Sequence, residues 1–192
     1  MPAPNHAALD FLLTRRSRPA KTLTTPVPER AQVETLLTAA ARTPDHGKLE
    51  PWRFVVLARP ALERLAAAVP ATGERLGQPP EGVEKMTRQF ADAHLAVAVM
   101  AAPKASEKIP EIEQVLSAGA VCLALLNAAL AAGWGANWLT GWAVHDRHFA
   151  TNHLGLAPGE FVAGMIHIGT ETATPPDRPR PDLRSITAWV EA

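Results

Sequence analysis

Tyrosine is absent from this chain of 192 residues, and cysteine occurs once, at Cys122. A single cysteine excludes an intrachain disulfide and gives no sign of an oxidising compartment, and inside an apolar run it is best interpreted as a small core residue. Lys and Arg number 19, as do Asp and Glu, so the formal net charge is zero and nothing favours nucleic acid or an anionic membrane surface. Basic residues follow the first apolar run and Asp10 interrupts it, which is not the pattern of a secretory signal. We therefore expect a cytoplasmic protein.

Several motifs are also missing. No G-x-G-x-x-G follows an expected strand, and no Walker-type phosphate loop is present, so the common dinucleotide and nucleotide fingerprints are excluded. His145, Asp146, His148 and His153 lie in one short segment, but no cysteine and no H-E-x-x-H pattern accompany them. We interpret this segment as an exposed polar face and predict no metal site.

The longest apolar stretch extends from residue 115 to residue 133 without a charged residue. As a helix it would span ~28 Å, enough to cross a bilayer or a small domain. It is rich in alanine and glycine, and acidic residues precede it, so we favour a soluble helix that protein buries on nearly every side. A chain of this length can hardly surround such a helix alone. We therefore expect it to form the core of a homodimer, with small residues allowing close approach: Ala118, Gly119, Ala124, Ala128 and Ala131.

The remaining patterns predict an α+β fold. Apolar spacing of three and four residues predicts helices over residues 5–16, 28–43, 61–69, 83–91 and 145–154, besides the long one at 112–133. Short apolar, β-branched runs predict strands at 52–57, 94–100, 136–139 and 161–169, and residues 70–82 are expected to be a turn-rich, mobile segment. His94 and His167 lie in such strands, so we expect core or interface residues with one hydrogen bond each.

Three polar groups are candidates for a site. Arg15, Arg16 and Ser17 follow the first helix and suit a phosphate or another anion, although a solvated basic helix end is an equally simple interpretation. The loop at 43–52 (TPDHGKLEPW) leads into a strand and could be an ordinary connection. Arg178 and Arg180 alternate with prolines, so they could reach one anion or belong to a solvated linker.

Taken together, these features resemble the nitroreductase family. The resemblance is carried by Arg15-Arg16-Ser17, by Arg42-Thr43-Pro44-Asp45-His46 followed by Pro51-Trp52-Arg53-Phe54, and by Gly133-Trp134-Gly135 with Trp138 after the long helix. It covers nearly the whole chain in matching order. It implies a nitroreductase-like fold with an antiparallel-dominated central sheet flanked by helices, in an intertwined homodimer with two FMN sites at the interface.

The resemblance also assigns residues to the FMN site. Arg15 and Ser17 would hold the phosphate and ribityl end with Arg16 nearby, and His46 would come from the partner subunit. The full set of implied cofactor-binding residues is Arg15, Arg16, Ser17, Arg42, His46, Trp138, Leu139, Thr140, Arg178 and Arg180. No protein side chain is expected to be catalytic, because FMN carries the chemistry. The segment 128–133 corresponds to one associated with NAD(P) in such proteins.

The resulting functional prediction is an FMN-dependent NAD(P)H oxidoreductase that reduces nitroaromatic, quinone or similar conjugated acceptors by ping-pong hydride transfer. The alternative is a flavin-binding or sensing protein without turnover. We expect a single domain over 1–192, with residues 170–192 as a tail that docks on the partner subunit.

Two residues depart from the family pattern and put the choice of acceptor in question: Glu50, where relatives have glutamine, and Leu139, where close relatives have arginine. Trp134, Trp138 and Trp142 could form core packing or an aromatic wall beside a planar ligand.

Overall fold

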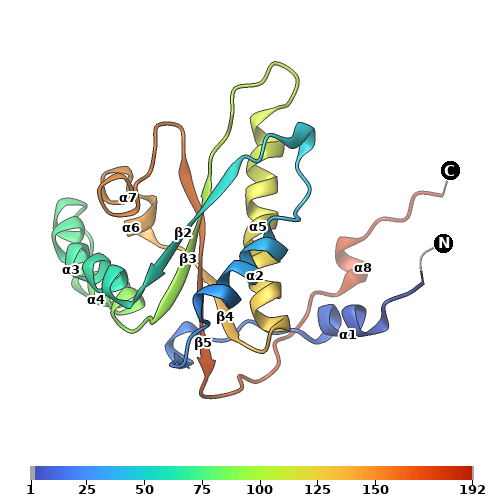
Figure 1. The fold of residues 1–192 in the computed structure, drawn as a ribbon, viewed down its shortest axis with the longest axis horizontal. Coiled ribbons are helices and arrows are strands. Elements are labelled where there is room, and N and C mark those ends of the chain that lie inside the picture. The colour runs from blue at the N-terminus through green and yellow to red at the C-terminus, as the bar shows by residue number, and fades with distance from the viewer. Residues whose placement is uncertain (1–2, 192) are drawn as a thin grey trace.

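The architecture, seen in a computed structural model that describes residues 3–191, is a central antiparallel sheet between two layers of helices (Figure 1). Its strands follow the order β1 (Leu23–Thr24), β5 (Phe161–Glu171), β3 (Leu95–Ala101) and β2 (Trp52–Ala58), and β4 (Gly135–Leu139) also pairs with β5. Every pair is antiparallel. The predicted α+β class and antiparallel-dominated sheet are confirmed.

Each face of the sheet carries its own group of helices. One face packs against α3 (Arg59–Arg75), α4 (Pro80–Ala91), α6 (Trp142–His145) and α7 (Arg147–Leu154). The other packs against α2 (Arg30–Ala40) and α5 (Glu111–Ala131). The short helices α1 (His6–Thr14) and α8 (Leu183–Ile186) extend away from the body on one side, and two 3-10 turns, Ala20–Thr22 and His46–Lys48, lie in loops (Figure 1).

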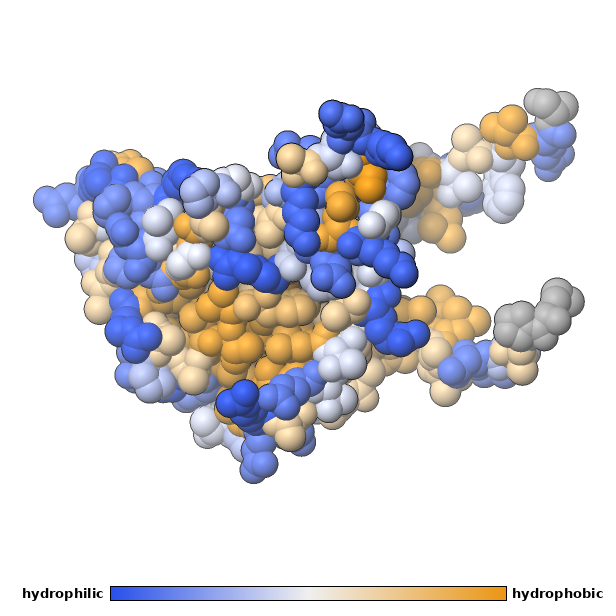
Figure 2. All heavy atoms as spheres, turned by 45° about the horizontal axis from the view of Figure 1, so that its top comes forward, coloured by the Kyte–Doolittle hydropathy of each residue, from blue (hydrophilic) through white to orange (hydrophobic). Residues whose placement is uncertain are grey.

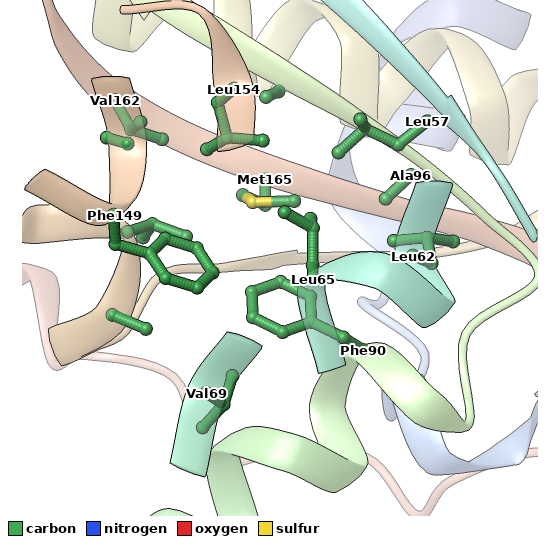
Figure 3. Packing of buried hydrophobic residues seen from close by; sticks show 14 of the residues in the cluster. Leu57, Leu62, Leu65, Val69, Phe90, Ala96, Phe149, Leu154, Val162 and Met165 are labelled. Carbon is green, nitrogen blue, oxygen red and sulfur yellow. The ribbon is translucent and has the colours of Figure 1, made fainter. Parts of the chain in front are cut away.

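The core beneath α3 and α7 is built from large side chains that alternate with the small residues of the sheet. Figure 3 shows Phe149 and Phe90 side by side below Met165 in this view, and their ring centroids lie 6.1 Å apart in a stacked arrangement. Leu62 and Leu65 fill the space between these rings and β3. Because β3 is buried on both faces, its alanines and valines allow both helical layers to pack closely.

The extent of α3 differs from the prediction. The helix continues through Pro70 to Arg75, and α4 begins at Pro80, so the expected mobile segment at 70–82 is wrong. A proline inside a helix removes one backbone hydrogen bond. Here Val69 and Thr72 remain buried on either side of it, and packing outweighs the local preference. Gly73 allows α4 to approach, since a Cβ there would lie 2.5 Å from the Cγ2 of Val83.

The long helix α5 is buried on one side only. Val121, Cys122 and Leu125 are fully buried against the sheet, whereas Ile112, Leu116 and Leu123 are exposed by 62%, 65% and 45%. One subunit thus leaves one side of α5 uncovered, as expected of a chain too short to surround the helix alone, and the second subunit that would cover it stays a prediction. Among the described residues α5 is the only helix long and apolar enough to cross a membrane, but its packing is that of a core helix.

Two smaller predictions are also corrected. The expected helix at 145–154 is two helices that meet at Asp146, whose side chain caps α7 by accepting a hydrogen bond from the Phe149 N–H. β5 extends to Glu171, so the first two residues of the predicted tail belong to the sheet.

Candidate functional site

Three arginines converge where α1 ends. Arg15 follows the last residue of α1, and its Nη2 donates a hydrogen bond of 3.1 Å to the hydroxyl of Ser17. Arg16 reaches the tail, where its Nε donates to the carbonyl of Pro176 at 3.2 Å. The Nη2 of Arg180 lies 3.5 Å from the carbonyl oxygen of Arg15. Segments 160 or more residues apart in the sequence therefore form one cationic cluster.

This cluster has the electrostatics of an anion site. The pKa of Arg15 is lowered by burial and by the positive charges of Arg180 and Arg16. The buried Nε of Arg15 has no hydrogen-bond partner among the described residues. A bound phosphate would offset the repulsion between these like charges with its negative charge. Its oxygens would also accept a hydrogen bond from the buried Nε. The residues present therefore fit the phosphate end of a nucleotide-type cofactor.

A cavity of about 790 Å³ begins two residues beyond Ser17 in the chain, and none of the cluster residues themselves lines it. The segment that follows Ser17 is bound to β4, because the Arg18 N–H donates to the Ala136 carbonyl and the Asn137 side chain donates to the Arg18 carbonyl, both at 2.8 Å. The next residues, from Pro19 to Lys21, form one wall of the cavity. The other walls come from α4 and the two residues that follow it, and from β4 and β5: Glu81, Glu84, Lys85, Arg88, Gln89, Asp92, Ala93, Asn137, Leu139 and His167.

The three residues predicted to line a flavin ring do not share one face. Leu139 lines the cavity. Trp138 lies on the opposite face, because it pairs with Ile166, which packs on the α5 side, and its indole covers Gly164. Thr140 is exposed just after β4, and its carbonyl lies 3.4 Å from the side-chain nitrogen of Gln89.

Of the two alternatives left open for the tryptophan repeat, core packing holds for Trp134 and Trp142, and no shared aromatic wall is formed within the described residues of one subunit. Trp134 packs against the α5 side of the core, and Trp142 packs against the other core cluster. With Trp138 at the sheet edge, the three rings occupy three separate places.

His46 and Arg42 lie at the far end of the molecule from the arginine cluster. The Nδ1 of His46 is 2.7 Å from Glu113, in the first turn of α5, and Arg42 is exposed just beyond α2. Arg18, next to the cluster, is bound to β4, which begins just after α5 ends. The 21 residues of α5 span ~30 Å, so His46 and Arg15 cannot contact one ligand within a single subunit.

The two arginines of the tail differ in their position relative to the cluster. Arg180 joins the cluster and also pairs with Asp177 at 3.3 Å. Arg178 is exposed, and its backbone N–H donates to Asp177. Of the two tail arginines, only Arg180 is thus placed beside Arg15.

Comparison with known proteins identifies the family. The sequence model of the nitroreductase family matches residues 12–170.

The chain belongs to the nitroreductase family.

Relatives support this over most of the chain. It is 31% identical over 163 residues to an Escherichia coli K12 protein named "Putative NAD(P)H nitroreductase YdjA", covering 85% of this chain and 87% of that protein. A Haemophilus influenzae protein with the name "Putative NAD(P)H nitroreductase" is 34% identical over 167 residues, covering 85% and 88%.

Solved structures agree with the fold. A "Nitroreductase-like Family Protein" from Bacillus cereus superposes with a TM-score of 0.80 at 21% identity over all of both chains. A "putative nitroreductase in complex with FMN" from Desulfovibrio desulfuricans superposes with a TM-score of 0.75 at 21% identity, over 98% of this chain and 99% of that one. The predicted nitroreductase-like fold, the class of FMN-type oxidoreductase and its use of FMN with NAD(P)H are confirmed at the level of the family.

The sequence analysis assigned none of the polar residues that line the nitroreductase cavity to a site, among them Lys85, Arg88 and His167. Lys85 and Arg88 are one helical turn apart on α4, and a charged pair at this spacing on a helix shares one face. That spacing was the available signal, but the sequence does not indicate that α4 faces the end of β4. His167 was expected to make one hydrogen bond, and the structure shows none among the described residues.

Proposed function

We propose that this chain is the subunit of a homodimeric, cytoplasmic FMN-dependent NAD(P)H oxidoreductase that reduces nitroaromatic compounds, quinones or similar conjugated acceptors. One observation carries the proposal. A buried arginine donor of the cationic cluster has no hydrogen-bond partner among the described residues, and the chain just beyond the cluster forms one wall of a cavity of about 790 Å³, in the size range of small-molecule sites. A phosphate at the cluster would place an attached planar ring in the cavity.

The roles of the residues follow from their chemistry. Arg15, Arg16, Ser17 and Arg180 would bind the phosphate through charge-assisted hydrogen bonds. Leu139 supplies an apolar contact for the ring.

The cations of the cavity have a separate role. Bound FMN supplies the redox chemistry, accepting a hydride from NAD(P)H and passing electrons to the acceptor. Lys85 and Arg88 line the cavity, where positive charge stabilises the negative charge that reduction creates. They are better placed for this than Arg42, which lies at the far end of the subunit.

A second subunit would complete the site. If two α5 helices pack antiparallel through their exposed stripes, the N-terminal end of one helix lies beside the C-terminal end of the other. The partner's His46 and the partner's Arg42 would then approach the arginine cluster, although they are ~30 Å from it within one chain. The exposed Leu183, Ile186, Trp189 and Val190 of the tail would pack on the partner subunit.

If the protein covered one face of a bound ring and left the other open, NAD(P)H and the acceptor would have to bind there in turn, which predicts ping-pong kinetics. Close relatives are expected to have an arginine at position 139, and this chain has Leu139. Because the site then lacks that positive charge, it favours uncharged acceptors.

The test is an anaerobic titration of the FMN-loaded dimer. NADH or NADPH should bleach the flavin absorbance, and a nitroaromatic or quinone should restore it. A flavin that stays oxidised with both nicotinamides would instead support a flavin-binding or sensing protein without turnover. Steady-state rates at several fixed acceptor concentrations should give parallel double-reciprocal lines, and intersecting lines would contradict the ping-pong order.

A further inference from the structure

His167 is a polar side chain in an apolar position. It lies on β5, is exposed by only 2%, and lines the cavity. Neither of its ring nitrogens has a hydrogen-bond partner among the described residues. A leucine or valine would satisfy the packing of this strand without leaving a donor and an acceptor unused.

The neighbouring strands offer His167 nothing to bind. Its cross-strand partner on β3 is Ala96, and its partner on β4 is Asn137. The amide of Asn137 donates to the carbonyl of Arg18 rather than to the imidazole. The charged groups around the cavity are Lys21 on one wall and, on and just beyond α4, Glu81, Glu84, Lys85, Arg88 and Asp92.

Burial determines the protonation state of the His167 imidazole. It lowers the pKa of His167 to about 4, so the ring is neutral at pH 7. A neutral imidazole has one N–H donor and one acceptor nitrogen. It therefore suits an uncharged ligand edge that carries carbonyl and N–H groups, whereas phosphate is served by the arginine cluster.

We propose that His167 is a positioning residue that forms a hydrogen bond with the polar edge of the isoalloxazine ring of FMN in this cavity. The inference rests on the proposed function, since FMN is the ligand assigned there. Two observations support it independently of the family: the buried imidazole has no hydrogen-bond partner in the part of the chain that the structure describes, and it lines the cavity, as Leu139 does.

The first experiment measures FMN binding by fluorescence quenching on apoprotein, for the wild type, His167→Leu and His167→Gln. Loss of one hydrogen bond to a buried ligand should weaken binding about tenfold in His167→Leu. His167→Gln keeps a donor and an acceptor and should recover most of the affinity. His148→Leu, on the exposed face of α7, is the matched control and should bind like the wild type.

A structural role for His167 predicts other results. If an internal water satisfies the ring, His167→Leu should lower the unfolding temperature of the apoprotein and leave FMN affinity unchanged, and that outcome overturns the proposal. The proposal instead predicts an unchanged or higher unfolding temperature for the apoprotein, because no bond is lost when FMN is absent.

A second readout uses the wild-type protein, so it does not depend on the folding of a variant. The ring ¹⁵N resonances of His167, assigned by their absence from the His167→Gln spectrum, should shift when FMN is added. Unchanged resonances at saturating FMN would contradict the inference even though FMN binds. If the wild-type apoprotein binds no FMN at all, the proposed function itself fails, which is a distinguishable result.

Discussion

At the scale of single residues, the arginine cluster gives the sharpest expectation. Arg15→Ala and Arg180→Ala should each weaken FMN binding by ~1–3 kcal/mol, because each removes a charge-assisted hydrogen bond to the phosphate. Arg178→Ala, two residues from Arg180 but outside the cluster, is the control and should change affinity little. Fluorescence titration of the three variants measures the difference. Equal losses for Arg178→Ala and Arg180→Ala would show that the tail arginines act as a general positive field.

The absence of a side chain at Gly164 leaves the space that the indole ring of Trp138 occupies. A Cβ at this position would lie 2.1 Å from the indole Nε1, so Gly164→Ala must displace the ring from the sheet edge. Overpacking of this kind costs ~1–3 kcal/mol. Gly82→Ala is the matched control, since its Cβ would meet its nearest neighbour at an ordinary 3.4 Å. Urea unfolding measures the cost, and a red shift of tryptophan emission in Gly164→Ala alone would report the displaced ring.

The residues of the site were predictable only where they lie close together in the chain or match a family motif. Arg15, Arg16 and Ser17 are consecutive, and their role as an anion site follows from residue type alone. Lys85 and His167 are on different elements, and only the fold brings them to one cavity. The resemblance grouped Trp138 with Leu139, but strand alternation puts neighbouring side chains on opposite faces of the sheet.

At the scale of elements, an ion pair attaches the loop before β5 to β2. The guanidinium of Arg53 donates to both carboxylate oxygens of Glu160, at 2.7 and 2.6 Å, and to the Gly155 carbonyl at 2.7 Å. The hydrogen bonds from Arg53 hold the pKa of Glu160 below its ordinary value, against the opposing effect of burial. The stabilisation is therefore complete above the unfolded-state pKa of about 4.3 and is lost as the pH falls through the lower folded-state pKa.

Glu160→Gln should cost ~1–3 kcal/mol of unfolding free energy at pH 7, since a paired charge on Arg53 loses its partner. The same variant should lose less stability than the wild type between pH 5 and acidic pH, because the titrating group is gone. Glu63→Gln removes an exposed pair with Arg59 and should change stability by at most ~1 kcal/mol. Urea unfolding across the pH range measures all three proteins. Parallel pH profiles for wild type and Glu160→Gln would contradict the assignment.

Most elements could be predicted from sequence because local pattern and tertiary packing agree. The spacing of Val33, Leu36 and Ala40 predicts α2, and these three residues are its buried face. The prediction failed at Pro70, where a residue that ordinarily ends a helix is outweighed by the buried residues on both sides of it. For α5, an apolar composition on every side predicts more burial than one short chain can supply; the single chain leaves Ile112, Leu116 and Leu123 exposed, and the second copy that would cover them stays a prediction.

At the scale of the whole molecule, a single chain leaves apolar side chains exposed in two places, on the terminal segments and on α5. In Figure 2 the two terminal segments project from the body with apolar side chains uncovered, and Leu9, Leu12 and Leu13 of α1 are exposed by 54%, 56% and 71%. The stripe on α5, formed by Ile112, Leu116 and Leu123, is uncovered as well. In an intertwined homodimer, the second copy would pack on the stripe and the terminal segments would pack against its surface. Both apolar surfaces would then be buried.

Leu116→Glu tests this arrangement, because a carboxylate in the middle of an apolar interface would be buried without a partner. We expect a monomer by light scattering at low micromolar concentration, where the wild type should be a dimer. The monomer should also lose FMN, since the partner's His46 no longer approaches the arginine cluster. Leu76→Glu, at the end of α3 and exposed by 38%, carries the same change on another surface and should remain a dimer with FMN bound. A monomeric Leu116→Glu protein that keeps full FMN affinity would mean that one chain holds the cofactor by itself, and the ~30 Å between His46 and Arg15 would then exclude His46 from the site.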